Sequence, residues 1–377
     1  MTGTLSGTFS MKYGGVANWR GCGHNRTIIL EGLLAMYTFY KQMFLTLCIG
    51  LLGALLFQFL HIPMPWLLGA IAAVLCVQLF TKVQLQWHKY FRNIGLVVAG
   101  YSIGFAFTKE ALQDIQQFLG SIIVLNLIFI LLFFAISLIV AKRTELDFPT
   151  ALTCCVPGGM TQIVAFAEEQ GNMNMAVITF YQVLRVLLIV GFVPLMVTGI
   201  GENIVTVDGS LSLRLFILLL ICGMAGWLAQ KVRIPTGYML GPVFLLMGLN
   251  IAGLEVPKMP LSFLHIAQLV IGIYIGLLLK KEDLHLSKKH VFYAFISAGL
   301  FIGSAYALSF VMKYLYALDF RTGFLSIVPG GLDQMGIIAA SVHANVTIVT
   351  AFQLFRVLIV SIFLVPLVKV FVKKAKT

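Results

Sequence analysis

The sequence predicts an all-α polytopic membrane protein made of two homologous inverted repeats, each with about five transmembrane helices and one helix that is broken or re-entrant at a Pro-Gly-Gly motif. Three observations predict this fold class: a strongly apolar composition, an internal duplication, and one Pro-Gly-Gly motif at the same position of each copy. Together they also indicate a solute site between the two copies.

The composition places the chain in a lipid bilayer. Of its 377 residues, 60% are hydrophobic and 11% are charged, and the mean hydropathy is +0.98, which is far from the balance of a soluble domain. From Met43 onward, apolar stretches of about 16 to 27 residues alternate with short charged loops, and many can cross a hydrocarbon core as helices. The net charge of +12 lies mainly in these loops, a pattern typical of membrane topology rather than of direct nucleic-acid binding.

Composition also divides the chain into parts. These are a polar leader (1–40), a first membrane repeat (41–199), an acidic linker (200–212), a second membrane repeat (213–372) and a basic tail (373–377). No secretory signal is recognised in the leader, because its apolar run is interrupted by Glu31. We expect the leader either to be disordered or to precede a true start at Met36; a regulatory extension is the alternative.

The second repeat restates the first at a nearly constant offset. The motif IPMPWLLGA at Ile62 aligns with IPTGYMLGP at Ile234, an offset of 172 residues, and Pro157 and Pro329 of the two Pro-Gly-Gly motifs keep this offset. One residue is then lost, so that YQVLRVLLIV aligns with FQLFRVLIV at an offset of 171. The repeated unit holds six apolar segments, in the first copy near 43–62, 66–81, 91–107, 119–141, 149–170 and 173–199.

The orientation of the repeats depends on whether the Pro-Gly-Gly segment crosses the membrane. If all six segments cross, the repeats are parallel; if this segment turns back, five cross and the second repeat is inverted. Apart from the first 40 residues and two Arg inside helices, inversion places sixteen Lys and Arg inside and five outside, against fourteen and seven for parallel repeats. Basic short loops favour the cytoplasm, so we predict inversion, in a bacterial cytoplasmic (inner) membrane with both termini cytoplasmic.

The paired Pro-Gly-Gly motifs predict a binding site. Inside hydrocarbon, a broken helix persists only where protein or cavity water satisfies its backbone, and the helix that restarts presents bare N–H groups to a ligand. Matched breaks in two repeats are typical of a transporter's midplane site; a kink used for packing is the alternative. The substrate-binding candidates at the breaks are Gly158, Gly159, Gln162, Gly330, Gly331 and Gln334.

A second repeated pattern places a glutamine and an arginine on one helix face. Gln182 and Arg185 match Gln353 and Arg356, three residues apart in each repeat. An arginine inside a membrane helix is costly and normally faces a cavity or a counter-charge. These four residues are substrate-binding candidates because Arg can hold a carboxylate or phosphate; the alternatives are pinning of the hairpin and a structural ion pair with the Glu168–Glu169 dipeptide.

The repeats differ at one acidic position, where Thr161 in the first break corresponds to Asp333 in the second. A carboxylate beside a broken helix can carry a proton or coordinate sodium. Asp333 is therefore the ion-coupling candidate, and capping of the new helix is the competing interpretation.

Other features predict ordinary packing. Gly100-x-x-x-Gly104 and Gly272-x-x-x-Gly276 suit close helix contacts. The six Cys contain no CxxC pair and the seven His form no ligand motif. The sequence therefore predicts no metal, no other cofactor and no enzyme.

The motif VPGG, followed by an amphipathic helix and QVLRVLLIV, resembles the membrane AbrB family, and the resemblance covers Phe44 to Val372. Family members carry two such repeats and have been labelled ammonia monooxygenases or regulators of gene expression. The family is also similar to cation/proton antiporters and anion symporters with inverted repeats and broken helices.

Residues and resemblance together predict a secondary transporter of a small anionic solute, with its site between the two broken helices and with coupling to protons or sodium left open. A membrane-embedded sensor or regulator that acts indirectly on gene expression is the alternative. The expected partners are the solute and the lipid bilayer, and homo-oligomerisation is left open.

Overall fold

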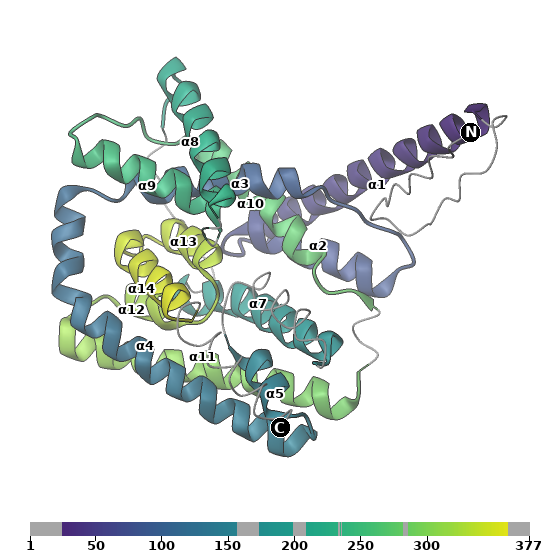
Figure 1. The fold of residues 1–377 in the computed structure, drawn as a ribbon. Helices are drawn as coiled ribbons and strands as arrows, with labels where there is room; N and C mark the ends of the chain where they lie inside the picture. Colours follow the sequence, from purple (N-terminus) through teal and green to yellow (C-terminus); the bar gives the residue numbers. More distant parts are fainter. Residues whose placement is uncertain are drawn as a thin grey trace, which may run out of the picture. The chain divides into compact units, whose positions relative to one another are not determined.

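The computed structural model describes residues 25–156, 173–198, 209–232, 234, 236–281 and 286–360, with side chains from Met36 onward except those of Glu110, Asp114 and Asp333. The chain divides into two compact units, Met1–Gln42 and Met43–Thr377. Helix α1 (Asn25–Phe59) begins in the first unit, so the described end of the predicted leader is helical. The other helices all belong to the second unit (Figure 1).

The described part of the second unit contains helices and no strand. After α1 come α2 (Pro65–Phe80), α3 (Lys89–Phe105), α4 (Lys109–Thr144), α5 (Phe148–Cys155), α7 (Met175–Thr198), α8 (Leu213–Lys231), α9 (Gly237–Ile251), α10 (Leu261–Gly276), α11 (Lys288–Tyr316), α12 (Phe320–Ile327), α13 (Leu332–Ser341) and α14 (Val346–Ile359). Five of the six predicted apolar segments of the first repeat are found as helices, and α4 is longer than its predicted segment at 119–141. The sixth, 149–170, begins with α5 and lies outside the described residues from 157 onward.

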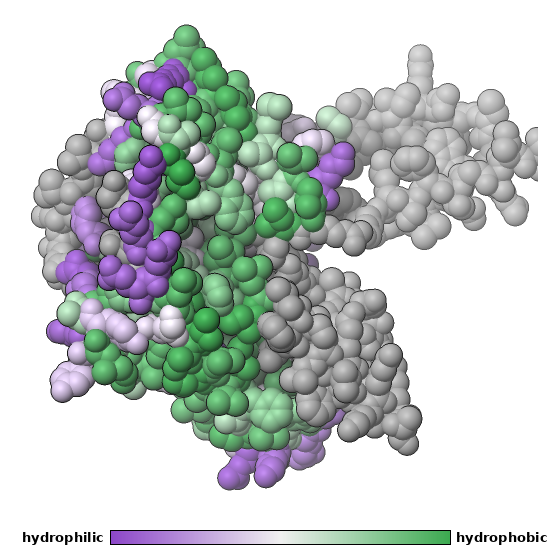
Figure 2. All heavy atoms as spheres, turned by 60° about the vertical axis from the view of Figure 1, so that its left-hand side comes forward, coloured by the Kyte–Doolittle hydropathy of each residue, from purple (hydrophilic) through white to green (hydrophobic). Residues whose placement is uncertain are grey.

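Five described helices are long and apolar enough to cross a membrane: Met36–Phe59, Ala111–Thr144, Met175–Val197, Leu213–Lys231 and Lys288–Tyr316. Large apolar side chains on them are exposed, among them Leu131 at 70% and Leu220 at 72%. Figure 2 shows hydrophobic residues over much of the visible face, with hydrophilic residues gathered along its left side and lower edge. Such a surface fits an integral membrane protein, because lipid rather than water would cover it.

The two halves repeat the same local structure. Helices α5 and α12 both follow an aspartate, Asp147 or Asp319, whose carboxylate accepts a hydrogen bond from a backbone N–H of the first turn. The residues before α2 and α9, Met64 and Thr236, both have left-handed backbone conformations, with φ of 53° and 49°. All of these pairs are related by the 172-residue offset seen in the sequence.

The glycine motifs pack helices of different repeats together. A β-carbon added at Gly104 on α3 would lie 2.9 Å from Cα of Val243 on α9, and one at Gly276 on α10 would lie 3.0 Å from the carbonyl oxygen of Ile71 on α2. Val243 and Ile71 are themselves corresponding residues. The predicted close packing is confirmed, and each repeat supplies the partner helix for the other's glycine motif.

Replacing Gly272 with alanine is expected to destabilise the protein by about 1–3 kcal/mol, because the new methyl group would overpack the α10–α2 contact. The added β-carbon would lie 2.7 Å from the carbonyl oxygen of Leu67, a backbone atom that cannot move away alone. Gly223 on α8 has nothing within 4 Å and is the matched control. Thermal unfolding in detergent would test this; equal unfolding midpoints for Gly272→Ala and Gly223→Ala would contradict it.

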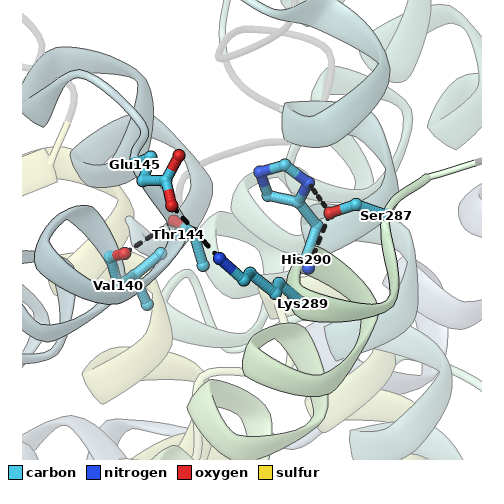
Figure 3. Close-up of polar contacts among 6 residues, drawn as sticks. All are labelled: Val140, Thr144, Glu145, Ser287, Lys289 and His290. Carbon is cyan, nitrogen blue, oxygen red and sulfur yellow. Dashed lines mark hydrogen bonds and ion pairs between the residues drawn. The ribbon is translucent and has the colours of Figure 1, made fainter.

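Corresponding helices of the two repeats pack in opposite directions. Phe118 near the start of α4 contacts Tyr316 at the end of α11, with ring centroids 5.9 Å apart. At the other end, Glu145 after α4 pairs with Lys289 Nζ at 3.1 Å, beside Ser287, the N-cap of α11 (Figure 3). The end of α4 therefore lies beside the beginning of α11, and the two helices run side by side in Figure 1.

Two amide side chains join the repeats near the ends of α10 and α3. Gln78 on α2 donates through Nε2 to the carbonyl oxygens of Leu277 at 3.2 Å and Leu279 at 3.0 Å, just beyond α10. Asn250 on α9, its counterpart at the 172-residue offset, donates through Nδ2 to three carbonyl oxygens at the end of α3, at 3.2 to 3.3 Å: those of Gly104, Phe105 and Phe107. Each amide adds a donor to carbonyls at a helix end, where intrahelical donors run out.

Candidate functional site

The second Pro-Gly-Gly motif interrupts a helix inside the protein core. Helix α12 ends at Ile327, and α13 begins at Leu332 after Gly331, whose φ of 94° suits glycine. Gly330 is buried, and a β-carbon there would lie 2.8 Å from Cγ2 of Ile189 on α7. The predicted interruption is therefore present in the second repeat, and it packs against a helix of the first.

Gln353 and Arg356 on α14 hold the end of α12. Gln353 Nε2 donates to the carbonyl oxygens of Leu325 at 2.8 Å and Val328 at 2.9 Å. Arg356 donates through Nη1 to the same Val328 oxygen at 3.0 Å and through Nη2 to the Ser326 oxygen at 2.7 Å. Together they bind three of the carbonyl groups that precede the break.

Gln182 and Arg185 on α7 do the same for α5 in the first repeat. Gln182 Nε2 donates to the carbonyl oxygens of Thr153 at 2.8 Å and Val156 at 3.0 Å. Arg185 donates through Nη1 to the Cys155 oxygen at 3.1 Å and through Nη2 to Oε1 of Gln182 at 2.6 Å. We call the pairs Gln182–Arg185 and Gln353–Arg356 the carbonyl clamps.

The carbonyl clamps have a clear structural chemistry. The last carbonyl groups of a helix lack intrahelical partners, and a cation is favourable at that end of the helix dipole. Both clamps supply N–H donors and a positive charge at such an end. The geometry fits the pinning that the sequence left open as one alternative. The Glu168–Glu169 dipeptide of the other lies outside the described residues, and direct contact between these four residues and a solute stays a prediction.

The two clamps differ in one partner. Arg356 Nε donates to Oδ1 of Asn126 on α4 at 3.3 Å, whereas the residue that corresponds to Asn126 in the second repeat is Ala298. Arg185 Nε has no hydrogen-bond partner among the residues that the structure describes. No carboxylate is among the described buried side chains, so the charges buried there, Arg185 and Arg356, are both positive.

Several predicted residues lie outside the described part. The residues of the first break (Gly158, Gly159 and Gln162) and the Glu168–Glu169 dipeptide fall within 157–172, and the side chain of Asp333 is also outside it. Gln334 lies in the first turn of α13 and is half-buried. Within the described ranges, no group of three or more His, Cys, Asp or Glu residues could hold a metal ion.

A cavity of about 470 Å³ lies between the repeats. It is lined by the end of α1 and the turn before α2, by α3, by the first half of α10, and by the last turns of α13, the helix that restarts after the break. Its described polar side chains are Gln58, His61, Ser102, His265, Gln268 and Ser341, and none of the described lining residues is Asp, Glu, Lys or Arg.

Gln268 is the most buried polar side chain of this lining, at 8% exposure. Its Nε2 donates to Ser341 Oγ at 3.0 Å, and that hydroxyl donates in turn to the Ile337 carbonyl oxygen at 2.9 Å. Among described residues, nothing binds the second N–H or the Oε1 atom of Gln268, or the hydroxyl of Ser102. The cavity wall therefore presents uncommitted hydrogen-bonding groups.

Larger side chains stand at the opposite end of the α3–α10 pair. These helices are antiparallel, so Arg92 near the start of α3 lies over the ring of Tyr274 near the end of α10, 4.8 Å from its centroid. By the 172-residue offset, Arg92 and Tyr274 correspond to Leu264 and Ser102, which line the cavity. Larger side chains thus occupy the positions that correspond to the cavity wall.

Sequence reasoning missed the cavity residues. The signal was present in the aligned repeats, where small or polar residues of the cavity wall correspond to larger apolar residues at the 172-residue offset. Ala99 corresponds to Ile271, which is 1% exposed, and Gln268 corresponds to Leu96, also 1% exposed. Only the packing of both helix pairs shows that these differences open a space.

Comparison with known proteins gives one family and two distant relatives. Residues 66–372 match the family model AbrB, described as "Transition state regulatory protein AbrB". The chain is 22% identical over 350 residues to "Uncharacterized protein YhjN" of Bacillus subtilis (strain 168), and the aligned region covers 85% of this chain and 90% of that protein. It is 25% identical over 318 residues to "Putative regulator AbrB" of Escherichia coli (strain K12), covering 82% and 91%.

Proposed function

The chain belongs to the AbrB family, and we propose that it is a secondary transporter of a small anionic solute, with the solute site between its two broken helices. One observation carries the proposal: the cavity between the repeats is walled by α13, the helix that restarts after a buried Pro-Gly-Gly break. Irregular backbone at membrane depth is tolerated where it lines a cavity or is buried in protein, and paired breaks of this kind mark solute sites in transporters.

The anionic solute is supported by the charges of the interior. Arg185 and Arg356 are 5% and 3% exposed, and the described buried side chains include no carboxylate to balance them. Buried charges are screened far less than charges at a surface. A solute with a negative charge would therefore gain more from this interior than a cation would.

The proposal includes inverted repeats, supported by the antiparallel packing of two corresponding helix pairs, α3 with α10 and α4 with α11. The proposal also places the protein in a bacterial inner membrane, with both termini on the cytoplasmic side. Asp333 remains the proposed site of coupling to protons or sodium.

Single cysteines at Ser210 and Ser287 are expected to react from opposite sides of the membrane, because inversion places the linker outside and the α10–α11 loop inside. Both residues are exposed. The measurement is labelling by a membrane-impermeant thiol reagent in intact cells and in inside-out vesicles, in a version of the protein without its native cysteines. Labelling of both from the same side would contradict inversion.

Purified protein in liposomes tests the transport function. Labelled small organic anions should accumulate inside protein-containing liposomes when a proton or sodium gradient is imposed, and not in protein-free liposomes or without a gradient. Asp333→Asn should then remove the response to the gradient while the protein stays folded. Folded protein that moves none of the anions under either gradient would count against a transporter.

A regulatory role is the second candidate, favoured by the name of the relative in Escherichia coli, "Putative regulator AbrB". Transcript levels in cells that carry a folded but transport-inactive variant separate the two functions. If the transcripts respond to the inactive variant as they do to the unaltered protein, regulation does not depend on transport and the protein is a membrane-embedded regulator.

A further inference from the structure

The cavity wall offers hydrogen-bond donors at its buried side and apolar surface elsewhere. Gln268 keeps one N–H that no described residue accepts, and the Ser102 hydroxyl has no described partner. Around them lie the apolar side chains of Ala99, Ile103 and Leu264. A solute that fits this wall needs one acceptor group and an apolar body.

The charges around the cavity bear on whether the acceptor group of the solute is a charged carboxylate or a neutral group. The described residues of the lining include no Asp or Glu, which would repel an anion and attract a cation. A carboxylate that accepts several N–H or O–H donors is stabilised without a direct ion pair, and donors to a charged acceptor form stronger hydrogen bonds than donors to a neutral one. The buried positive charges of Arg185 and Arg356 act in the same direction.

The size of the cavity limits the solute. A volume of about 470 Å³ is within the range of small-molecule sites. It equals the share of about fifteen water molecules in the liquid, so a compact solute of about ten non-hydrogen atoms fits with some water left.

We propose that this cavity binds a small organic carboxylate, with the carboxylate held by Gln268 and Ser102 and the apolar body lying against α3 and α10. The inference rests on the transporter function proposed above and names the class of its solute. Among the described residues, the opposite end of the α3–α10 pair does not repeat this site, because Tyr274 and Ile271 stand there in place of Ser102 and Ala99.

A cysteine at Ala340 reports on the cavity. Ala340 lines it from α13 and is half-buried, and cysteine is only slightly larger than alanine. In a version without native cysteines, Ala340→Cys should react with N-ethylmaleimide. Solutes that occupy the cavity should slow this reaction.

Benzoate and benzamide form a matched pair of probes, since they share a planar shape and differ in charge, and benzylammonium is a cation of similar size. Benzoate should slow labelling of Ala340→Cys at concentrations about tenfold lower than benzamide does, as expected when a neutral acceptor replaces a charged one. Benzylammonium should have no effect. The proposal is overturned if benzoate gives no protection, or if benzylammonium protects as well as benzoate.

Two substitutions test Gln268 against a control residue of the same type. Gln268→Leu, which introduces the side chain that Leu96 has in the other repeat, should leave labelling intact and weaken benzoate protection about tenfold. It strands no donor, because the Ser341 hydroxyl keeps its bond to Ile337. Gln58→Leu, the same change at the exposed rim of the cavity, is the control and should leave protection unchanged. Equal loss in both variants would overturn the role of Gln268.

Ala99→Ile, which introduces the side chain that Ile271 has in the other repeat, should fill the cavity and slow labelling of Ala340→Cys in the folded protein. The thermal unfolding midpoint of each variant identifies any variant that fails to fold. If Ala99→Ile fails to fold, the comparison of Gln268→Leu with Gln58→Leu still tests the proposal.

Transport measurements in liposomes separate the carboxylate site from the transport function. If benzoate protects but no anion moves, transport is wrong and the site stands; if anions move but benzoate does not protect, the carboxylate site is wrong and transport stands.

Discussion

Replacing Arg356 with methionine is expected to be among the most damaging single changes in the protein. The side chain donates to Val328 and Ser326 at the broken end of α12 and to Asn126 on α4. Methionine fills much of the space and donates nothing, so the Ser326 carbonyl and the Asn126 amide oxygen lose their donor inside the protein. Each buried acceptor left unpaired costs about 1–3 kcal/mol, so the two acceptors together predict a total loss of about 2–6 kcal/mol.

The same change at Arg185 should cost less. Arg185 makes two hydrogen bonds to described residues, and its Nε makes none. Thermal unfolding of Arg185→Met and Arg356→Met in detergent gives the comparison, and a lower midpoint for Arg185→Met would contradict it.

Lysine at the same positions separates the carbonyl clamp from direct solute binding. Lysine keeps the charge and loses the planar set of donors. Because both arginines already donate to backbone carbonyl oxygens at the ends of α5 and α12, Arg185→Lys and Arg356→Lys should lower stability while solute affinity in the folded molecules stays within about twofold, a change of less than about 0.5 kcal/mol. A loss of affinity without a loss of stability would instead show that these arginines contact the solute.

Much of the fold was predictable because membrane helices have a strong sequence signal. Long apolar segments, the 172-residue repeat and the glycine motifs correspond to observed helices and contacts. Pro329 and Gly331 predicted the interruption between α12 and α13, since few other residues allow it. These features depend on local composition or on spacing, which a single sequence contains.

The partners of the site residues were not predictable in the same way. Gln353 and Arg356 stood out as polar residues in an apolar helix, but they bind backbone carbonyl oxygens, which every residue has and no motif marks. The cavity was missed because it results from small side chains on two helices that meet only in three dimensions. Asn250 and Gln78 were missed for the same reason.

Asn250→Leu is expected to disturb the cavity as well as lower stability. Asn250 is the amide that binds three carbonyl oxygens at the end of α3, and this end carries Ile103 and Ser102 in the cavity wall. Leucine has nearly the same size and no donor, so those carbonyls lose a partner at a cost of about 1–3 kcal/mol. Hydrogen exchange in the last turn of α3 should become faster.

Gln78→Leu provides the matched comparison, because it removes the corresponding amide from the other repeat. Gln78 binds carbonyl oxygens just beyond α10, at the end of that helix that lies away from the cavity. The two variants should lose similar stability, yet only Asn250→Leu should change the rate at which N-ethylmaleimide labels Ala340→Cys. If both change this rate equally, the amide bonds act on the stability of the whole unit; if only Asn250→Leu does, the end of α3 sets the shape of the cavity.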